Sequence, residues 1–215
     1  MIYVKTAKST LDNVAQLFAT QPRAFYSRFG DGDVYIMMGK DQANHKASPA
    51  LTQEMIESFN IVHPLYLKGL AVNHPIEPGM VRGLFAVFRD NADMQNFLED
   101  TFGTLGQKSF ENPVFLHYLA VFQPQAVNAF MDEVIRPKRK MFIGSVPKEK
   151  VEQLIGPVAH YIQTPAKNSY AEINCWWPEV IKHLNDVELV IPAAAFVPQI
   201  PQSVYRTGSV VINVC

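Results

Sequence analysis

The sequence predicts an α/β fold in which a mostly parallel sheet carries helices on both faces. Short apolar runs alternate with stretches of helical periodicity, which is the order expected of strand–helix–strand units. The chain has 215 residues, of which 48% are hydrophobic and 18% are charged, so it can bury one sizeable core. We therefore expect residues 1–215 to form a single α/β domain.

Six apolar runs bounded by Gly, Pro, Ser or Asp are predicted to be strands. They lie at residues 24–29, 64–72, 140–144, 160–164, 187–196 and 209–214. Most of these runs are joined by a helical or irregular crossover, which implies parallel strands covered on both faces.

Four segments carry helical periodicity or helix-end signals. They lie at residues 11–20, 33–39, 147–156 and 169–184. In the third segment a proline stands near the start and Gly156 suits the end. In the fourth, Pro178 should kink or restart the helix, because proline has no amide hydrogen for the helical ladder.

The middle of the chain, about residues 79–136, departs from this alternation. Its periodicity is helical throughout, with apolar residues at i, i+3 and i+4 in four successive stretches. We interpret this segment as a helical insertion or cap on the α/β core.

Charge and composition narrow the class of protein. A formal net charge of -1 provides no field for a polyanion, and the basic cluster at residues 136–140 is interpreted as a solvated loop, so nucleic-acid binding is not expected. No apolar run approaches the ~18 residues that span a bilayer, and no secretion signal is visible. Cys175 and Cys215 fit neither a disulfide framework nor a zinc site. We expect a cytoplasmic protein without a transmembrane segment; a homo-oligomer is left open.

The stretch SRFGDGD, residues 27–33, follows the first long predicted strand. In a parallel α/β sheet, ligands bind beyond the carboxyl ends of the strands. Gly30 and Gly32 would permit a sharp turn and a close approach of backbone to ligand. Arg28 could pair with nearby carboxylates or bind a phosphate.

Asp31 and Asp33 stand two residues apart in this stretch and could aim their carboxylates at one point. Two like charges held together favour a shared cation, and oxygen ligands favour Mg²⁺ or Mn²⁺, which could in turn hold a diphosphate. The alternative is that one aspartate only caps the helix that begins at Val34.

Polar residues also follow other predicted strands. Asn73 is placed for sugar hydroxyls, with a turn role as the alternative, and Ser145 could donate to a phosphate near the next helix. His45 and Lys46 are interpreted as part of a solvated loop, and the histidines at 63, 160 and 183 show no spacing that pairs them. The chain has no P-loop, nucleophile elbow or complete dinucleotide fingerprint.

These motifs, taken in order along the chain, resemble those of the GT-D-type glycosyltransferases, a bacterial group first known as a domain of unknown function. SRFGDGD resembles their Arg-Phe-Gly-Asp-Gly-Glu signature, and IQTPAKNSYAEINCWWPEVI, at 162–181, resembles a strand that ends at Pro-x-x-Asn-Ala-Phe. KMFIGS, ELVIPAAAF and VVINV resemble the family's strands. The resemblance covers residues 23–41 and 138–215.

The resemblance implies a Rossmann-like nucleotide-sugar-binding fold, a divalent metal, and transfer of a hexose from a UDP-sugar to a hydroxyl of a carbohydrate or glycoprotein acceptor. It assigns metal and diphosphate binding, and with them catalysis, to Asp31 and Asp33. Arg28, Gly30 and Gly32 shape the loop. Lys167 and Asn168 contact nucleotide or sugar.

The chain departs from the family pattern at three places. Asp33 replaces Glu, the alanines at 193–195 replace a Gly-rich turn, and Asn213, a candidate substrate-binding residue, stands in place of an Asp-x-Gly sequence. A non-catalytic nucleotide or nucleotide-sugar binding module of the same fold is therefore the main alternative. A methyltransferase or dehydrogenase with an atypical loop is a third.

Overall fold

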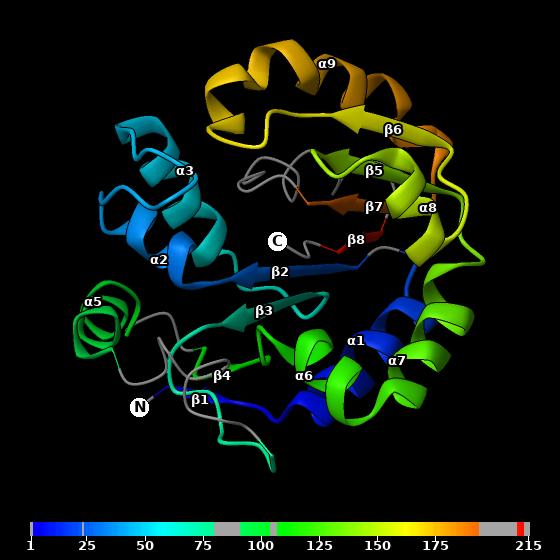
Figure 1. Ribbon diagram of the computed structural model, residues 1–215. Coiled ribbons are helices and arrows are strands. Elements are labelled where there is room, and N and C mark those ends of the chain that lie inside the picture. The colour runs from blue at the N-terminus through cyan, green and yellow to red at the C-terminus, as the bar shows by residue number, and fades with distance from the viewer. Residues whose placement is uncertain (1, 23, 80–90, 104–106, 194–209, 213–215) are drawn as a thin grey trace.

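The computed structural model describes residues 2–22, 24–79, 91–103, 107–193 and 210–212, and its centre is a six-stranded sheet in the order β3-β2-β8-β7-β5-β6. The strands are β2 (Phe25–Phe29), β3 (Tyr66–Leu70), β5 (Lys140–Gly144), β6 (His160–Gln163), β7 (Leu189–Pro192) and β8 (Val210–Ile212). Every neighbouring pair in this sheet is parallel, and the arrowheads of β2, β3, β5 and β6 in Figure 1 point the same way. The predicted parallel α/β fold is confirmed.

The strand order places β2 second from one edge of the sheet, between β3 and β8. β2 pairs with β3 along its length, from Phe25 opposite Tyr66 to Phe29 opposite Leu70, and with β8 on its other side. The chain builds β3 toward one edge and β5 and β6 toward the other, then returns to the middle for β7 and β8. Such a reversal of strand order opens a crevice beyond the carboxyl ends of the central strands.

Helices cover both faces of the sheet, as predicted. One face packs against α2 (Asp31–Met37), α3 (Pro49–Asn60), α5 (Ala92–Phe102) and α9 (Ile173–His183). The other face packs against α1 (Ala7–Thr20), α6 (Phe115–Phe122), α7 (Pro124–Phe130), the π-helix Met131–Ile135 and α8 (Lys148–Ile155). Two short 3-10 turns, Ser169–Glu172 and Leu184–Asp186, flank α9.

The alternation of side chains along the strands creates two separate cores. Phe25 and Phe29 of β2 belong to the first cluster, and Tyr26 belongs to the second. Phe59 of α3 lies at the centre of the first, with its ring centroid 4.9 Å from that of Phe29 and 4.4 Å from that of Phe102. Burial on both faces explains why the strands are apolar runs in the sequence.

A two-stranded parallel sheet extends the fold beside β3. It joins β1 (Tyr3–Val4) to β4 (Ser109–Phe110), and an isolated bridge links Gly69 of β3 to Glu111. Glu111 is buried and accepts hydrogen bonds from Lys5 Nζ at 2.6 Å and Asn13 Nδ2 at 3.2 Å. The segment after β4 is thereby fixed against the carboxyl half of β3.

Several elements differ from the sequence prediction. α3 was not predicted, although Ser48 caps it and Pro49 starts it. α2 begins at Asp31 rather than at residue 33, and α9 continues through Pro178 instead of restarting there. The middle segment is not helical throughout, because it contains β4. Its α6 and α7 contact each other, and α6 packs on α1, while α5 lies in the cluster on the opposite face.

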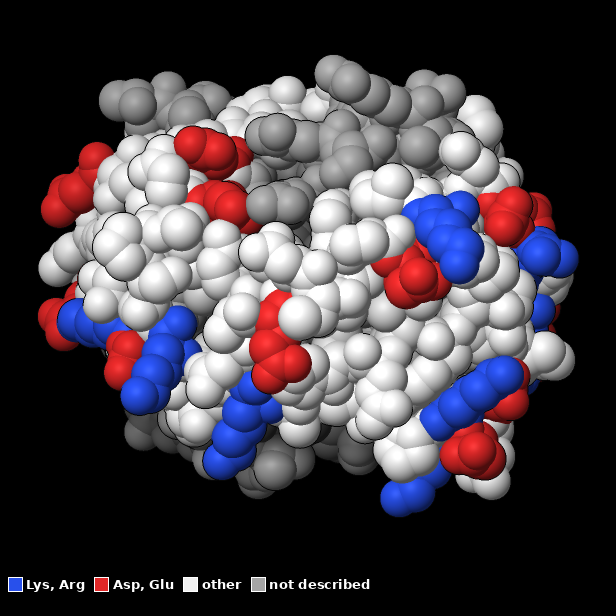
Figure 2. Space-filling model, turned by 90° about the horizontal axis from the view of Figure 1, so that it is seen from above, with Lys and Arg blue, Asp and Glu red and all other residues white. Residues whose placement is uncertain are grey.

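The face of the molecule seen from above is mixed in charge. Figure 2 shows Lys and Arg interspersed with Asp and Glu on this face. Within the basic cluster at 136–140, the solvated-loop interpretation is wrong for Lys140. This side chain is buried, and its Nζ donates to Arg136 O and Pro157 O, both at 3.1 Å.

Among the described residues, no helix is both long enough and apolar enough to cross a membrane.

Candidate functional site

The turn from β2 into α2 carries the SRFGDGD motif. The Gly30 N–H donates to Asp33 Oδ2 at 2.7 Å, so the Asp33 carboxylate closes the first turn of α2. The predicted cap differs in detail: Gly30 is the N-cap, α2 begins at Asp31 rather than at Val34, and Asp33 is the third helical residue, whose carboxylate accepts from the N–H of the N-cap.

The two glycines do not serve a left-handed turn. Gly30 has a φ of -75°, and Gly32 is not among the residues with positive φ, so the expectation of a special backbone angle is wrong. A Cβ on Gly30 would lie 2.8 Å from Arg28 Nη1, which is closer than real contacts, whereas a Cβ on Gly32 would make an ordinary 3.5 Å contact with Gln42. A side chain at Gly30 would therefore displace the Arg28 guanidinium, which is the end of a flexible side chain, and Gly32 is not required by the packing of the described residues.

Arg28 links the motif to the opposite layer of the fold. Its Nε donates to Pro113 O at 3.1 Å, in the connection between β4 and α6. Its guanidinium lies against Gly30, and its positive charge lowers the pKa of Asp33. Arg28 thus balances part of the acidic charge at the end of β2.

The Asp33 carboxyl is in an environment that resists ionisation. Its pKa is raised from 3.8 to about 6, first by burial and also by the charge of Asp31, although Arg28 and the Gly30 N–H act in the opposite direction. Asp31 is half-exposed and accepts no hydrogen bond from the described residues. A desolvated carboxylate beside a second, unengaged carboxylate is a donor set that fits a divalent cation with oxygen ligands.

The remaining predicted residues lie along the same edge of the sheet. Asn73 follows β3, adopts a φ of 56° as a turn residue does, and accepts from Gln95 Nε2 at 2.9 Å. Ser145 is exposed at the end of β5, three strand spacings or roughly 14 Å from β2. Lys167 is exposed after β6, and Asn213 lies outside the described residues.

Asn168 joins the far edge of the sheet to the motif. Its backbone is left-handed, its N–H donates to Asn44 O at 2.9 Å, and its Oδ1 accepts from the Lys46 N–H at 2.9 Å. Asn44 and Lys46 belong to the loop between α2 and α3, which also places Gln42 beside Gly32. This loop therefore crosses the carboxyl edge from the end of β2 to the end of β6.

A polar cleft of about 630 Å³ opens where this loop meets α3 and the segment after β6. Its lining includes His45, Lys46, Glu54, Asn168 and Tyr170. The Tyr170 hydroxyl donates to Glu54 Oε1 at 2.8 Å, and burial together with this carboxylate raises the pKa of Tyr170 to about 12. The cleft has the volume expected of a small-molecule site, roughly 300–1,000 Å³.

Three residues of this cleft were missed by sequence reasoning. His45 was assigned to a solvated loop, but it is 5% exposed and burial lowers its pKa. Glu54 and Tyr170 were not considered, since they come together only when α3 packs near the end of β6. The helix-start signal Ser48-Pro49, followed by apolar residues four apart, could have placed Glu54 on a helix.

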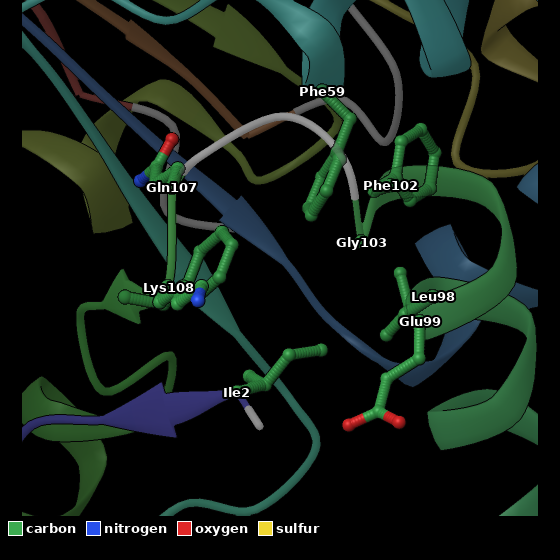
Figure 3. Close-up of a pocket in the computed structure, with 9 residues that line it drawn as sticks. Ile2, Phe59, Leu98, Glu99, Phe102, Gly103, Gln107 and Lys108 are labelled. Carbon is green, nitrogen blue, oxygen red and sulfur yellow. The ribbon is translucent and has the colours of Figure 1, made fainter.

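Two other cavities fit a nucleotide sugar less well. The pocket in Figure 3, between α5 and the β4 region, has a volume of only about 50 Å³. A cavity of about 300 Å³ on the opposite face is lined by apolar side chains of α6, α7 and α8, with His117 as its titratable group. None of the three cavities, the cleft beside α3 included, is lined by residues of the SRFGDGD motif.

Comparison with known proteins gives structural matches only. No family model and no curated protein matches the sequence. A solved structure described as a new glycosyltransferase (DUF1792) from Streptococcus sanguinis is similar with a TM-score of 0.72 and 13% identity, covering 100% of this chain and 81% of that chain. A structure of the same domain of unknown function, described as having a distinct glycosyltransferase fold, gives a TM-score of 0.63 and 14% identity over 99% of this chain and 78% of that one.

These comparisons establish the class of fold. A third structure, a selenomethionine-substituted domain of unknown function 1792, is similar with a TM-score of 0.64 and 14% identity over 99% of this chain and 78% of that chain. The chain therefore has the fold of the DUF1792 domains. The resemblance drawn from SRFGDGD and the later motifs is confirmed at the level of the fold.

The raised pKa of the Asp33 carboxyl predicts that the stability of the chain depends on pH when a chelator keeps metal ions away from it. Because the folded pKa of about 6 lies above the ordinary 3.8, the charged carboxylate destabilises the folded chain as the pH rises through this interval. Between about pH 4 and pH 7, the native chain should lose about 1–3 kcal/mol of unfolding free energy relative to Asp33→Asn. Urea unfolding of both proteins at several pH values measures this difference.

Asp33→Ala is the matched control for the hydrogen bond from the Gly30 N–H to Asp33. Asparagine keeps an oxygen for the Gly30 N–H, whereas alanine does not, so the alanine variant should be about 1 kcal/mol less stable than the asparagine variant at every pH. Parallel stability curves for the native chain and Asp33→Asn would contradict the assignment of a raised pKa to this carboxyl.

Proposed function

We propose that this chain is a glycosyltransferase that uses a divalent metal, Mn²⁺ or Mg²⁺, to transfer a hexose from a UDP-sugar to an acceptor hydroxyl. The observation that carries the proposal is the acidic pair at the carboxyl end of β2, in a chain whose fold matches a described glycosyltransferase over its whole length. The acceptor class is a carbohydrate or glycoprotein.

Asp31 and Asp33 would hold the metal through their carboxylates. Asp31 supplies the half-exposed ligand, and Asp33 supplies the oxygen that the Gly30 N–H does not occupy. A bound divalent ion stabilises the charge that develops on the departing nucleoside diphosphate. The raised pKa of Asp33 means that metal binding must displace a proton below about pH 6, so metal affinity should fall in acid.

Arg28 orients the acidic end of this site. Its guanidinium is fixed by Pro113 O and lies against Gly30, where its charge favours the ionised form of Asp33. The same charge is placed to attract the diphosphate of a donor. Gly32 has no side chain on the first turn of α2, so a ligand could approach the backbone there beside Gln42.

The cleft between the α2–α3 loop and the segment after β6 supplies the second half of the donor site. Asn168 uses Oδ1 to hold the Lys46 backbone, and its Nδ2 donates no hydrogen bond to the described residues, so it is placed to bind a hydroxyl or carbonyl of the donor. Lys167 and Ser145 are exposed at the same edge and are proposed as outer phosphate or sugar contacts, with Asn73 after β3 on the other side of β2. Asn213, which lies outside the described residues, is proposed as a further substrate contact from the sequence alone.

Removal of the proposed metal ligand should abolish transfer. Asp31→Asn keeps the size of the side chain but removes its charge, so release of UDP from UDP-sugars in the presence of Mn²⁺ and a panel of carbohydrate acceptors should fall at least about 100-fold, or about 3 kcal/mol. Asp12→Asn, on the exposed face of α1, is the matched control and should retain native turnover.

Equal turnover by the native chain and Asp31→Asn would refute the metal assignment. If calorimetry shows UDP binding but no acceptor in the panel supports transfer, the binding-module alternative is correct instead. That alternative is favoured by one observation, the commitment of Asp33 Oδ2 to the helix cap.

The variant Gly32→Ala distinguishes an effect on ligand binding from an effect on protein stability. The added methyl makes only an ordinary contact with Gln42, and alanine is favoured over glycine in a helix by up to about 1 kcal/mol, so the melting temperature should be unchanged or higher. The affinity for UDP with Mn²⁺, measured by calorimetry, should nevertheless fall by about tenfold or more, because the methyl occupies the space beside the carboxylates. Native affinity in this variant would show that the donor does not approach the first turn of α2.

A further inference from the structure

Two histidines and an aspartate come together at the end of the sheet opposite the SRFGDGD motif. Among the described residues, His160, His183 and Asp186 each offer a ligand atom, and these atoms lie within 4.8 Å of one another. His160 starts β6, His183 ends α9, and Asp186 belongs to the turn that follows. The spacing in sequence gave no sign of this cluster, because β6 and α9 are brought together only by the fold.

The distances between the three groups match a tetrahedral metal. His160 Nε2 lies 3.6 Å from Asp186 Oδ2, and His183 Nδ1 lies 3.5 Å from the same oxygen. Four ligands at the usual 2.0–2.1 Å from zinc are about 3.3–3.4 Å apart, so the Asp186 oxygen already lies at a suitable distance from both nitrogens. The two imidazole rings stack with centroids 4.0 Å apart and planes inclined by 17°, so at least one ring must rotate out of the stack before both nitrogens point at one ion.

The atoms of the cluster are incompletely satisfied within the protein. His160 Nε2 is buried and has no hydrogen-bond partner, which is costly for a polar atom. Arg139 Nε donates to Asp186 O at 2.6 Å, which fixes the backbone of the proposed carboxylate ligand.

A second carboxylate is placed to support His183. Glu179 Oε2 lies 3.6 Å from His183 Nε2, one helical turn earlier on α9. In metal sites, the histidine nitrogen that does not bind the ion usually donates to such a carboxylate, which fixes the tautomer. With Nε2 protonated toward Glu179, Nδ1 of His183 is left to coordinate.

We propose that His160 Nε2, His183 Nδ1 and Asp186 Oδ2 form a zinc-binding site that joins the start of β6, the end of α9 and the turn before β7. Figure 1 shows the tail of β6 and the end of α9 at the opposite end of the strands from α2, so this site is separate from the acidic pair at the end of β2. Three protein ligands leave one position for water, and the ion would stabilise the β6–α9–β7 unit.

Zinc titration of the full chain by calorimetry tests the proposal. Millimolar Mg²⁺ should be present, because it occupies carboxylate-only sites but competes poorly for imidazole. The native chain should bind one equivalent of Zn²⁺ in the micromolar range or more tightly. His183→Gln and Asp186→Asn should bind about 100-fold more weakly or not at all, and Glu179→Gln should bind roughly tenfold more weakly with the same stoichiometry.

Matched variants and a stability measurement guard against indirect effects. His63→Gln removes a histidine elsewhere, and Asp31→Asn alters the acidic pair at the end of β2, so both should bind zinc as the native chain does. In EDTA, the native chain and His183→Gln should have similar melting temperatures. Without EDTA, added Zn²⁺ should raise the melting temperature of the native chain only. The proposal is overturned if the native chain takes up no zinc, if His183→Gln binds it with native affinity, or if Asp31→Asn abolishes binding.

Discussion

The site depends on the hydrogen bond that the Gly30 N–H donates to Asp33 Oδ2 at 2.7 Å, which closes the turn from β2 into α2. Arg28 donates from Nε to Pro113 O, and its guanidinium lies against Gly30. The charge of Arg28 lowers the pKa of Asp33, whereas burial and the charge of Asp31 raise it. A positive charge, a helix start and two acids thus lie together at one turn.

The sheet order determines what surrounds this turn. Because the chain returns to the middle of the sheet for β7 and β8, residues from both halves of the sequence end at the same edge as β2. The α2–α3 loop then crosses that edge and binds Asn168 after β6. The proposed donor site is therefore divided between an acidic part at β2 and a polar cleft nearer β6, both on the face of the sheet that α2, α3 and α9 cover.

Much of the fold was predictable, because strands buried on both faces remain apolar runs and turn residues mark their ends. The position of the acidic motif at the end of β2 followed from the same logic. The site could not be completed from sequence, since Glu54, Tyr170 and Asn168 meet only through packing between α3, the α2–α3 loop and the segment after β6. The sequence also could not show what Gly30 does. A glycine suits both a positive φ and a close neighbour, and only the structure shows that Gly30 has a close neighbour, Arg28, and no positive φ.

The central claim is that the acidic pair at the β2–α2 turn holds a dication that binds the diphosphate of a sugar donor. A crystal structure of the chain with UDP and Mn²⁺, using the anomalous signal of manganese to locate the ion, tests it most directly. The account predicts one manganese ion in contact with Asp31, Asp33 and both phosphates. Bound UDP with no manganese at these carboxylates, or a manganese ion bound away from them, would contradict it.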